Sequence, residues 1–165
     1  MVKHLWLARH AQAAESGMGI PDFDRPLTSE GVLQAARVGK HLQQLFPDPQ
    51  KIMSSSALRA RTTAAHFAEQ YSYDPLGLMV EDDLYEASVR TFLGFINRLP
   101  ANLDRVIIVA HNPAVSYLSE YLSRAEIGNM VPCSAVHLSL ETDDWQAWSE
   151  GTATFHQMIS PYTLG

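Results

Sequence analysis

The sequence predicts an α/β fold, a three-layer α/β/α sandwich around a mostly parallel central sheet with an antiparallel edge. Short apolar segments alternate with amphipathic segments of helix length through most of the chain, as in a parallel sheet with helical crossovers. Beyond Gly128 apolar and polar residues alternate, which is typical of a hairpin at a sheet edge. With 165 residues the chain can form one core, so we expect a single domain over residues 1–165.

A long loop separates the first strand from the first helix. Residues 2–8 form an apolar run that predicts a strand, and residues 11–26 are rich in Gly, Asp and Pro. A loop of this length directly after a strand end is a candidate rim for a substrate site. Thr28 is a suitable N-cap for a helix that keeps one apolar face to about Phe46 and ends before Pro47.

The second strand and helix place an arginine at a helix N-terminus. Residues 51–54 predict a short strand, and residues from about 57 to 71 predict a helix with Arg59 in its first turn. A helix N-terminus does not stabilise a cation. An anion that contacts both Arg59 and the free N–H groups therefore explains this position better than a solvated arginine does.

The rest of the chain continues the alternation and then changes to antiparallel strands. A β-branched, nearly continuous apolar run predicts the most deeply buried strand. The expected elements are a weak strand at 78–80, a helix near 89–100, the buried strand at 105–110, a helix that starts at Asn112-Pro113, an edge hairpin with limbs at 136–140 and 145–148, and a final strand at 152–158.

Composition excludes several classes of function. The formal net charge of −6 argues against a nucleic-acid binder, so any anion site must be local. No segment is long and apolar enough for a signal-peptide core or a membrane span. The single cysteine, Cys133, cannot form an internal disulfide and is expected to be an ordinary small residue, which favours a cytoplasmic location. No metal-ligand or nucleotide-binding spacing occurs, so we expect no metal and no cofactor.

Basic and histidine side chains follow three of the predicted strands. Arg9 and His10 come directly after the first strand, and His111 comes directly after the strand at 105–110. Arg59 follows the strand between them. Because the carboxyl ends of parallel strands meet at one edge of a sheet, we expect two histidines and two arginines to surround one anion.

This combination resembles the histidine phosphatase superfamily, also called the phosphoglycerate-mutase-like family, whose signature is Arg-His-Gly after the first strand. Ala11 stands here in place of the Gly, and at a positive φ an Ala would carry a backbone cost. The short length and the closing segment 157–161 are most similar to the small bacterial phosphohistidine phosphatases. The other blocks, in the family's order, are Leu27-Thr28-Ser29-Glu30-Gly31, the pattern of Ser55, Arg59, Ala60 and Thr63, Leu84-Tyr85-Glu86-Ala87-Ser88, and Ala110-His111-Asn112-Pro113.

Four of these residues have the chemistry of phosphoryl transfer. A neutral imidazole keeps a lone pair near neutral pH, so His10 is the candidate nucleophile. Arg9 and Arg59 can hold the phosphoryl oxygens, and His111 can donate one more hydrogen bond to them, which stabilises the transition state without a metal. The resemblance implies that Glu86 is the proton donor, although the sequence alone also allows a solvated surface carboxylate.

Three further residues are candidates for substrate binding. Asn112 could orient His111 or cap the helix that follows. Arg25 could border the substrate or pair with Asp24. Ser55 is expected to cap the helix of Arg59 and to lie near the phosphate.

The leading hypothesis is a metal-independent phosphatase that works through a covalent phosphohistidine intermediate. The short spacing between Arg59 and His111 leaves no room for a sizeable lid, so an open pocket should admit a phosphorylated side chain of another protein. The expected partner is phosphohistidine on a histidine-containing phosphotransfer domain. The alternatives are a small phosphomonoester as substrate, or a phospho-group binding module without turnover; a mutase would need a more enclosed site.

Overall fold

Six strands form one sheet in the order β3-β2-β4-β1-β5-β6 in the computed structural model, which describes residues 1–17 and 19–164. The strands are β1 (Val2–Arg9), β2 (Lys51–Ser55), β3 (Met79–Glu81), β4 (Arg105–Ala110), β5 (Ala135–Glu141) and β6 (Thr154–Ile159). The helices are α1 (Ser29–Leu45), α2 (Leu58–Gln70), α3 (Val89–Asn97) and α4 (Ala114–Ser123), with short 3-10 turns η1 (Asp22–Asp24), η2 (Pro75–Gly77), η3 (Asp82–Leu84) and η4 (Trp145–Ala147).

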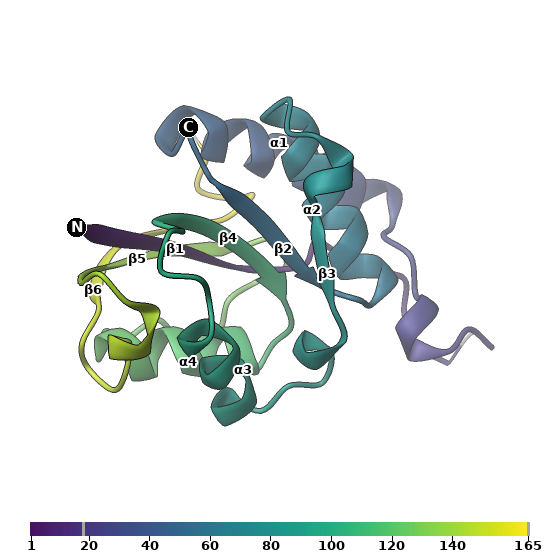
Figure 1. Ribbon diagram of the computed structural model, residues 1–165. Coiled ribbons are helices and arrows are strands. Elements are labelled where there is room, and N and C mark those ends of the chain that lie inside the picture. The colour runs from purple at the N-terminus through teal and green to yellow at the C-terminus, as the bar shows by residue number, and fades with distance from the viewer. Residues whose placement is uncertain (18, 165) are drawn as a thin grey trace.

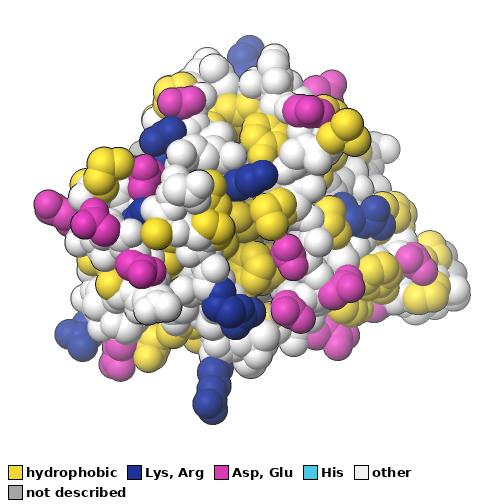
Figure 2. Space-filling view, in the orientation of Figure 1, with side chains coloured by type: hydrophobic (Ala, Val, Ile, Leu, Met, Phe, Trp, Pro, Cys, Tyr) yellow, Lys and Arg dark blue, Asp and Glu magenta, His cyan; other side chains and the backbone are white. Residues whose placement is uncertain are grey.

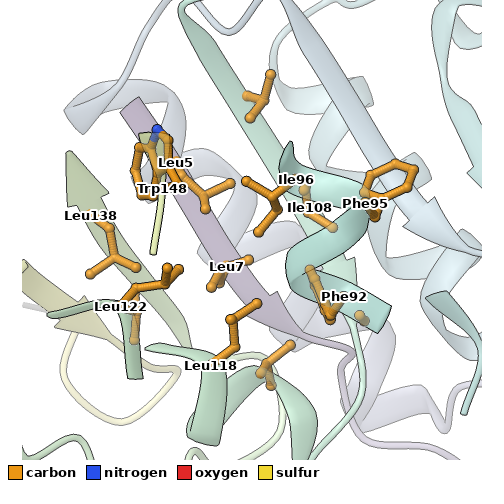
Figure 3. Close-up of a cluster of buried hydrophobic side chains, with 14 of the residues drawn as sticks. Leu5, Leu7, Phe92, Phe95, Ile96, Ile108, Leu118, Leu122, Leu138 and Trp148 are labelled. Atoms are coloured by element: carbon orange, nitrogen blue, oxygen red, sulfur yellow. The ribbon is translucent and has the colours of Figure 1, made fainter. Parts of the chain in front are cut away.

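The helices cover the two faces of the sheet in pairs, α1 and α2 on one face and α3 and α4 on the other (Figure 1). Alternate side chains of β1 point to opposite faces of the sheet and pack against the two helix layers. Leu5 and Leu7 pack against the cluster formed with α3 and α4, which Figure 3 shows, whereas Trp6 and Ala8 pack under α1 and α2. All four side chains are buried, so this part of the strand is apolar on both faces. The predicted three-layer α/β/α fold is confirmed.

Strand direction brings the expected site residues to one edge of the sheet. β1, β2 and β4 are parallel neighbours, with β4 in the middle. The register pairs Arg9 with Ala110 and Ser54 with Val109, so all three strands end at nearly the same level. The residues that follow these ends lie together on the side where the arrowheads of β2 and β4 point in Figure 1.

The edge hairpin differs from the sequence prediction. Residues 145–147 form the 3-10 turn η4, and the second limb beside β5 is β6. The reason is that both tryptophans of this segment are buried. The rings of Trp145 and Trp148 stack with their centroids 5.2 Å apart, and the side-chain amide of Asn97 donates to the backbone carbonyls of both residues. These contacts hold residues 145–148 against α3 and keep them out of the sheet.

The start of α1 is fixed against the loop that follows β1. Thr28 is the N-cap, as predicted, and its hydroxyl accepts a hydrogen bond from the Gly31 amide. Gly31 lies so close to the backbone of Gln12 that a Cβ there would overlap the Gln12 carbonyl. The first turn of α1 therefore supports the segment directly after His10.

No helix in the part of the chain that the structure describes is both long and apolar enough to cross a bilayer.

Candidate active site

A pocket of about 270 Å³ opens at the ends of β2 and β4. The two basic groups in its lining are Arg59, in the first turn of α2, and His111, directly after β4. His10 lies beside His111, with the two ring centroids 5.2 Å apart. The other lining residues are Leu84, Tyr85, Glu86, Ala87, Asn112, Pro113 and Ala114.

His10 is held in one tautomer by its own chain. Its Nδ1 lies 2.7 Å from the carbonyl oxygen of Ala11. A carbonyl can only accept, so Nδ1 carries the proton and Nε2 keeps the lone pair. Burial lowers the pKa of His10 to about 3, and the charges of Arg59 and Arg9 lower it as well, against the opposing effect of the hydrogen bond to Ala11. The imidazole is therefore neutral at pH 7.

Ser55 sets the same tautomer in His111, by a contact to the other ring nitrogen. The buried Ser55 hydroxyl accepts from the Ala57 amide and lies 2.8 Å from His111 Nε2. Its own proton is satisfied only if it donates to Nε2, which leaves the imidazole proton on Nδ1. Burial lowers the pKa of His111 to about 4, so this ring is also neutral at pH 7. Ser55 thus contacts a site side chain, whereas Ala57 is the N-cap of α2, so the predicted helix cap at Ser55 is wrong.

Three buried N–H donors belong to residues at the same edge of the sheet as His10. Arg9 Nε, Arg59 Nε and His111 Nδ1 are all buried, and none has a hydrogen-bond partner among the residues that the structure describes. Arg9 precedes His10 in the chain, the His111 ring centroid lies 5.2 Å from that of His10, and the hydrogen bonds of Thr63 join the first turn of α2, which carries Arg59, to the amide that follows His10. Buried donors are normally satisfied, and several at one place indicate a site for an anion that accepts from them.

Both arginines are also anchored away from these donors. Arg9 Nη1 donates to the Met130 carbonyl at 2.8 Å. Arg59 Nη1 and Nη2 donate to the backbone carbonyl and the carboxylate of Asp22 at 2.7 and 3.1 Å. These contacts fix the orientation of each guanidinium and do not use its Nε, which can still donate to a bound group.

Sequence reasoning missed Asp22 and Tyr85. The Tyr85 hydroxyl donates to Asp22 at 2.7 Å, and the Tyr85 ring packs edge-on against His111 and Phe23. The hydrogen bond from Tyr85 and the charge and hydrogen bonds of Arg59 lower the pKa of Asp22 to about 2. The only sequence signal was a cluster of charges in the loop, Asp22, Asp24 and Arg25, and it does not reveal which of them reaches α2.

The structure places the other predicted residues with different partners. Arg25 pairs with Asp22 at 3.0 Å rather than with Asp24, and it also donates to the Ala14 carbonyl. Asn112 does not orient His111 or cap α4 in the described part of the chain: its amide donates to Met130, and its carbonyl accepts from Ser116. Both residues hold loops at the rim.

Glu86 lines the pocket together with Arg59 and His111. Its side chain is exposed, and its backbone has a φ of 55° in the left-handed region. The Glu86 carboxylate is therefore an exposed acidic group in the same pocket lining as the two basic groups.

Ala11 carries no conformational cost. Its φ lies outside the left-handed region, and its side chain is fully buried in the core under α1 and α2. The Ala11 amide donates to the Thr63 hydroxyl, which in turn donates to the Arg59 carbonyl. This chain of hydrogen bonds fixes the end of β1 relative to the first turn of α2.

A larger hollow, of about 530 Å³, lies between β2, β3 and α3. Figure 2 shows hydrophobic side chains gathered in the middle of this face, and Met53, Met79, Phe95 and Leu99 are among the lining residues. Its described lining contains no histidine. The candidate anion site is therefore the smaller pocket at the strand ends, whose lining contains Arg59 and His111.

Other potential reactive groups are structural. Among residues 1–17 and 19–164, no cluster of three or more His, Cys, Asp or Glu side chains could hold a metal ion. Cys133 is buried, and burial raises the pKa of its thiol. Its amide donates to the His10 carbonyl, so Cys133 supports the backbone of the site.

Comparison with known proteins identifies relatives of this chain. The family model of the histidine phosphatase superfamily (branch 1) matches residues 5–95. The uncharacterised protein Rv1276c of Mycobacterium tuberculosis is 35% identical over 115 residues, which are 70% of this chain and 69% of that protein.

Solved structures share the whole fold at low identity. A putative phosphohistidine phosphatase SixA from Nakamurella multipartita superposes with a TM-score of 0.83 at 24% identity, over 98% of this chain and 97% of that one. A mycobacterial glucosyl-3-phosphoglycerate phosphatase superposes with a TM-score of 0.72 at 17% identity, over 94% and 97% of the two chains. At these identities the likeness establishes the fold alone.

Proposed function

The chain belongs to branch 1 of the histidine phosphatase superfamily, and we propose that it is a phosphatase that works through a covalent phosphohistidine intermediate on His10. The observation that carries this proposal is the set of three buried N–H donors at the same edge of the sheet as a neutral His10. A phosphoryl group has three terminal oxygens that can accept from them. The donors are fixed before substrate arrives, which is the arrangement that stabilises developing charge best.

The reaction has two steps. His10 Nε2 forms a bond to phosphorus while the bond to the leaving group breaks, and Glu86 gives that group a proton. Water then attacks the phosphohistidine with Glu86 as base, so that the P–N bond breaks, inorganic phosphate leaves and His10 is restored. Arg9, Arg59 and His111 hold the phosphoryl oxygens throughout, and Arg25, Asn112 and Ser55 fix the surrounding loops and rings.

The substrate that we favour is phosphohistidine on a protein partner. A pocket of about 270 Å³ is smaller than the ~300–1,000 Å³ typical of small-molecule sites, yet it can hold a phosphoryl group and one imidazole ring. The resemblance in fold to a protein described as a phosphohistidine phosphatase supports this choice. The second candidate is a small phosphomonoester, which the resemblance to a glucosyl-3-phosphoglycerate phosphatase supports.

Replacing His10 tests the covalent step. Wild-type protein should release phosphate from an aryl phosphate, and protein quenched during turnover should carry one acid-labile phosphoryl group. His10→Ala should lose turnover by on the order of 10⁴-fold or more, as when other nucleophiles are removed. His41→Ala on α1 is the matched control and should retain activity.

Phosphate release and intact mass after an alkaline quench are the two measurements. Turnover by His10→Ala close to that of wild type, without a trapped phosphoryl group, would show that His10 is not the nucleophile. Binding of phosphate without any turnover by the wild type would instead establish a phospho-group binding module.

A further inference from the structure

Asp22 accepts four hydrogen bonds from side chains, and these contacts join three segments of the site. Its carboxylate accepts from Tyr85, Arg59 and Arg25 at 2.7, 3.1 and 3.0 Å, and its backbone carbonyl accepts from Arg59 at 2.7 Å. We infer that Asp22 is a positioning residue, which holds the outer edge of the Arg59 guanidinium so that the Nε edge faces the phosphoryl group. This inference rests on the proposed function.

The geometry of a guanidinium gives the reason. Arginine offers two bidentate edges, one between Nη1 and Nη2 and one that includes Nε. Asp22 takes the first edge, because Nη1 and Nη2 both donate to it. Arg59 Nε, which has no partner in the described part of the chain, is the donor that remains for substrate. Without Asp22 the guanidinium could present either edge, and the fixed orientation would be lost.

The protonation states of Asp22 and Tyr85 suit this positioning role. The hydrogen bond from Tyr85 comes first among the causes that lower the pKa of Asp22 to about 2, and the same bond is the main cause that raises the pKa of Tyr85 to about 12. Near neutral pH the carboxylate is therefore ionised and the phenol keeps its proton. The contact to Arg59 does not depend on pH in the range where the reaction is measured.

Asp22 pairs with the buried Arg59 guanidinium from a position nearer the surface. Its side chain is 45% exposed, whereas that of Arg59 is 7% exposed. An exposed residue that is purely structural would be replaceable with little effect on the chemical step. A residue that orients Arg59 should instead affect the rate more than substrate binding, because the phosphoryl charge that Arg59 contacts changes most in the transition state.

The experiment compares three variants with the same assay. Asp22→Ala removes the carboxylate and should lower kcat by on the order of 10²-fold, with a much smaller change in KM. Asp22→Asn keeps an acceptor oxygen for Arg59 and should recover a large part of that loss. Asp24→Asn is the matched control, because Asp24 is an exposed carboxylate on the same turn η1, and it should stay within about twofold of wild type.

Two further measurements separate orientation from folding. In an Arg59→Lys background, Asp22→Ala should have little additional effect, because an ammonium has no edge to orient. In Asp22→Ala, affinity for orthovanadate, measured by calorimetry on the intact protein, should fall more relative to wild type than affinity for inorganic phosphate does. Melting temperatures of the variants report any general loss of structure.

Several outcomes would overturn the inference. A rise in activity of Asp22→Ala would mean that Asp22 obstructs the anion site, and an unchanged kcat would mean that Arg59 needs no orientation. An equal loss in the Arg59→Lys background would show that Asp22 does not act through Arg59. Failure of the wild type to turn over any phosphate substrate would contradict the proposed function, while the vanadate and phosphate affinities would still test the role of Asp22.

Discussion

The two histidines of the site are fixed by neutral partners of opposite kinds. A backbone carbonyl holds the proton on Nδ1 of His10, and the Ser55 hydroxyl leaves the proton of His111 on Nδ1 by occupying Nε2. A carboxylate in either position would favour the imidazolium and raise its pKa. Burial keeps both rings neutral, although the hydrogen bond to Ala11 raises the pKa of His10. In the proposed reaction one ring therefore offers a lone pair to phosphorus and the other an N–H to an oxygen.

At the same scale, Glu86→Gln tests leaving-group protonation. An alkoxide needs a proton when it leaves, whereas the imidazole of phosphohistidine can be protonated from solvent and leaves more easily. The variant should therefore lose ~10²–10⁴-fold in kcat/KM on an alkyl phosphate and much less on phosphohistidine. Asp83→Asn, which changes an exposed carboxylate on the neighbouring turn η3, should alter neither value.

Measuring kcat/KM for both substrates in all three proteins decides the role of Glu86. Equal losses on the two substrates would exclude a role in leaving-group protonation. No loss on either would make Glu86 a solvated surface carboxylate.

At the scale of elements, the sequence predicted what depends on local periodicity. β4 and α1 were predicted because their apolar spacing matches the buried faces, and Arg9, His10, Arg59 and His111 were found because they follow strand ends. Contacts between distant segments were not predictable in this way. The tie from Asp22 to Arg59 spans 37 residues, and the burial of Trp145 and Trp148 depends on where α3 lies.

The junction between α1 and the loop after His10 gives an element-scale prediction. Gly31→Ala should lower the free energy of unfolding by about 1–3 kcal/mol, because its Cβ would overlap the Gln12 carbonyl, and it should also lower kcat by displacing the segment after His10. Gly94→Ala is the matched control within α3. Its Cβ would meet only the end of the flexible Arg98 side chain, so the better helix propensity of Ala should stabilise the protein by up to about 1 kcal/mol.

Urea unfolding of the two variants measures both effects. Equal free energies of unfolding in Gly31→Ala and Gly94→Ala would mean that α1 and the loop after His10 can move apart without loss of stability. The loop would then not depend on α1 for its position.

At the scale of the whole molecule, the burial that suits His10 to its proposed role has a cost in acid. Burial is the main cause that lowers the pKa values of four histidines: His10 to about 3, His111 and His137 to about 4, and also His4. His4 and His137 lie next to each other on β1 and β5, with the ring nitrogens 2.9 Å apart, far from the pocket. Protonation of these buried histidines at low pH is therefore unfavourable both in the site and elsewhere in the sheet.

The sign of the pH dependence follows from these pKa values. Between pH 6.5, where histidine ionises in the unfolded chain, and about pH 4, the unfolded state binds more protons than the folded state, so the free energy of unfolding should fall as the pH is lowered. Asp22 acts in a lower range, because its stabilising ionisation is lost only as the pH falls below about 4 towards its folded pKa of about 2.

Urea unfolding at several pH values from 7.5 to 4.5 should show the decline in the free energy of unfolding that the buried histidines cause. His10→Ala and His137→Gln should each reduce the slope by up to about 1.4 kcal/mol per pH unit, which is one proton. A free energy of unfolding that stays constant over this range would mean that the buried histidines take up protons without unfolding. An unchanged slope in His10→Ala would mean that keeping His10 neutral has no cost in stability.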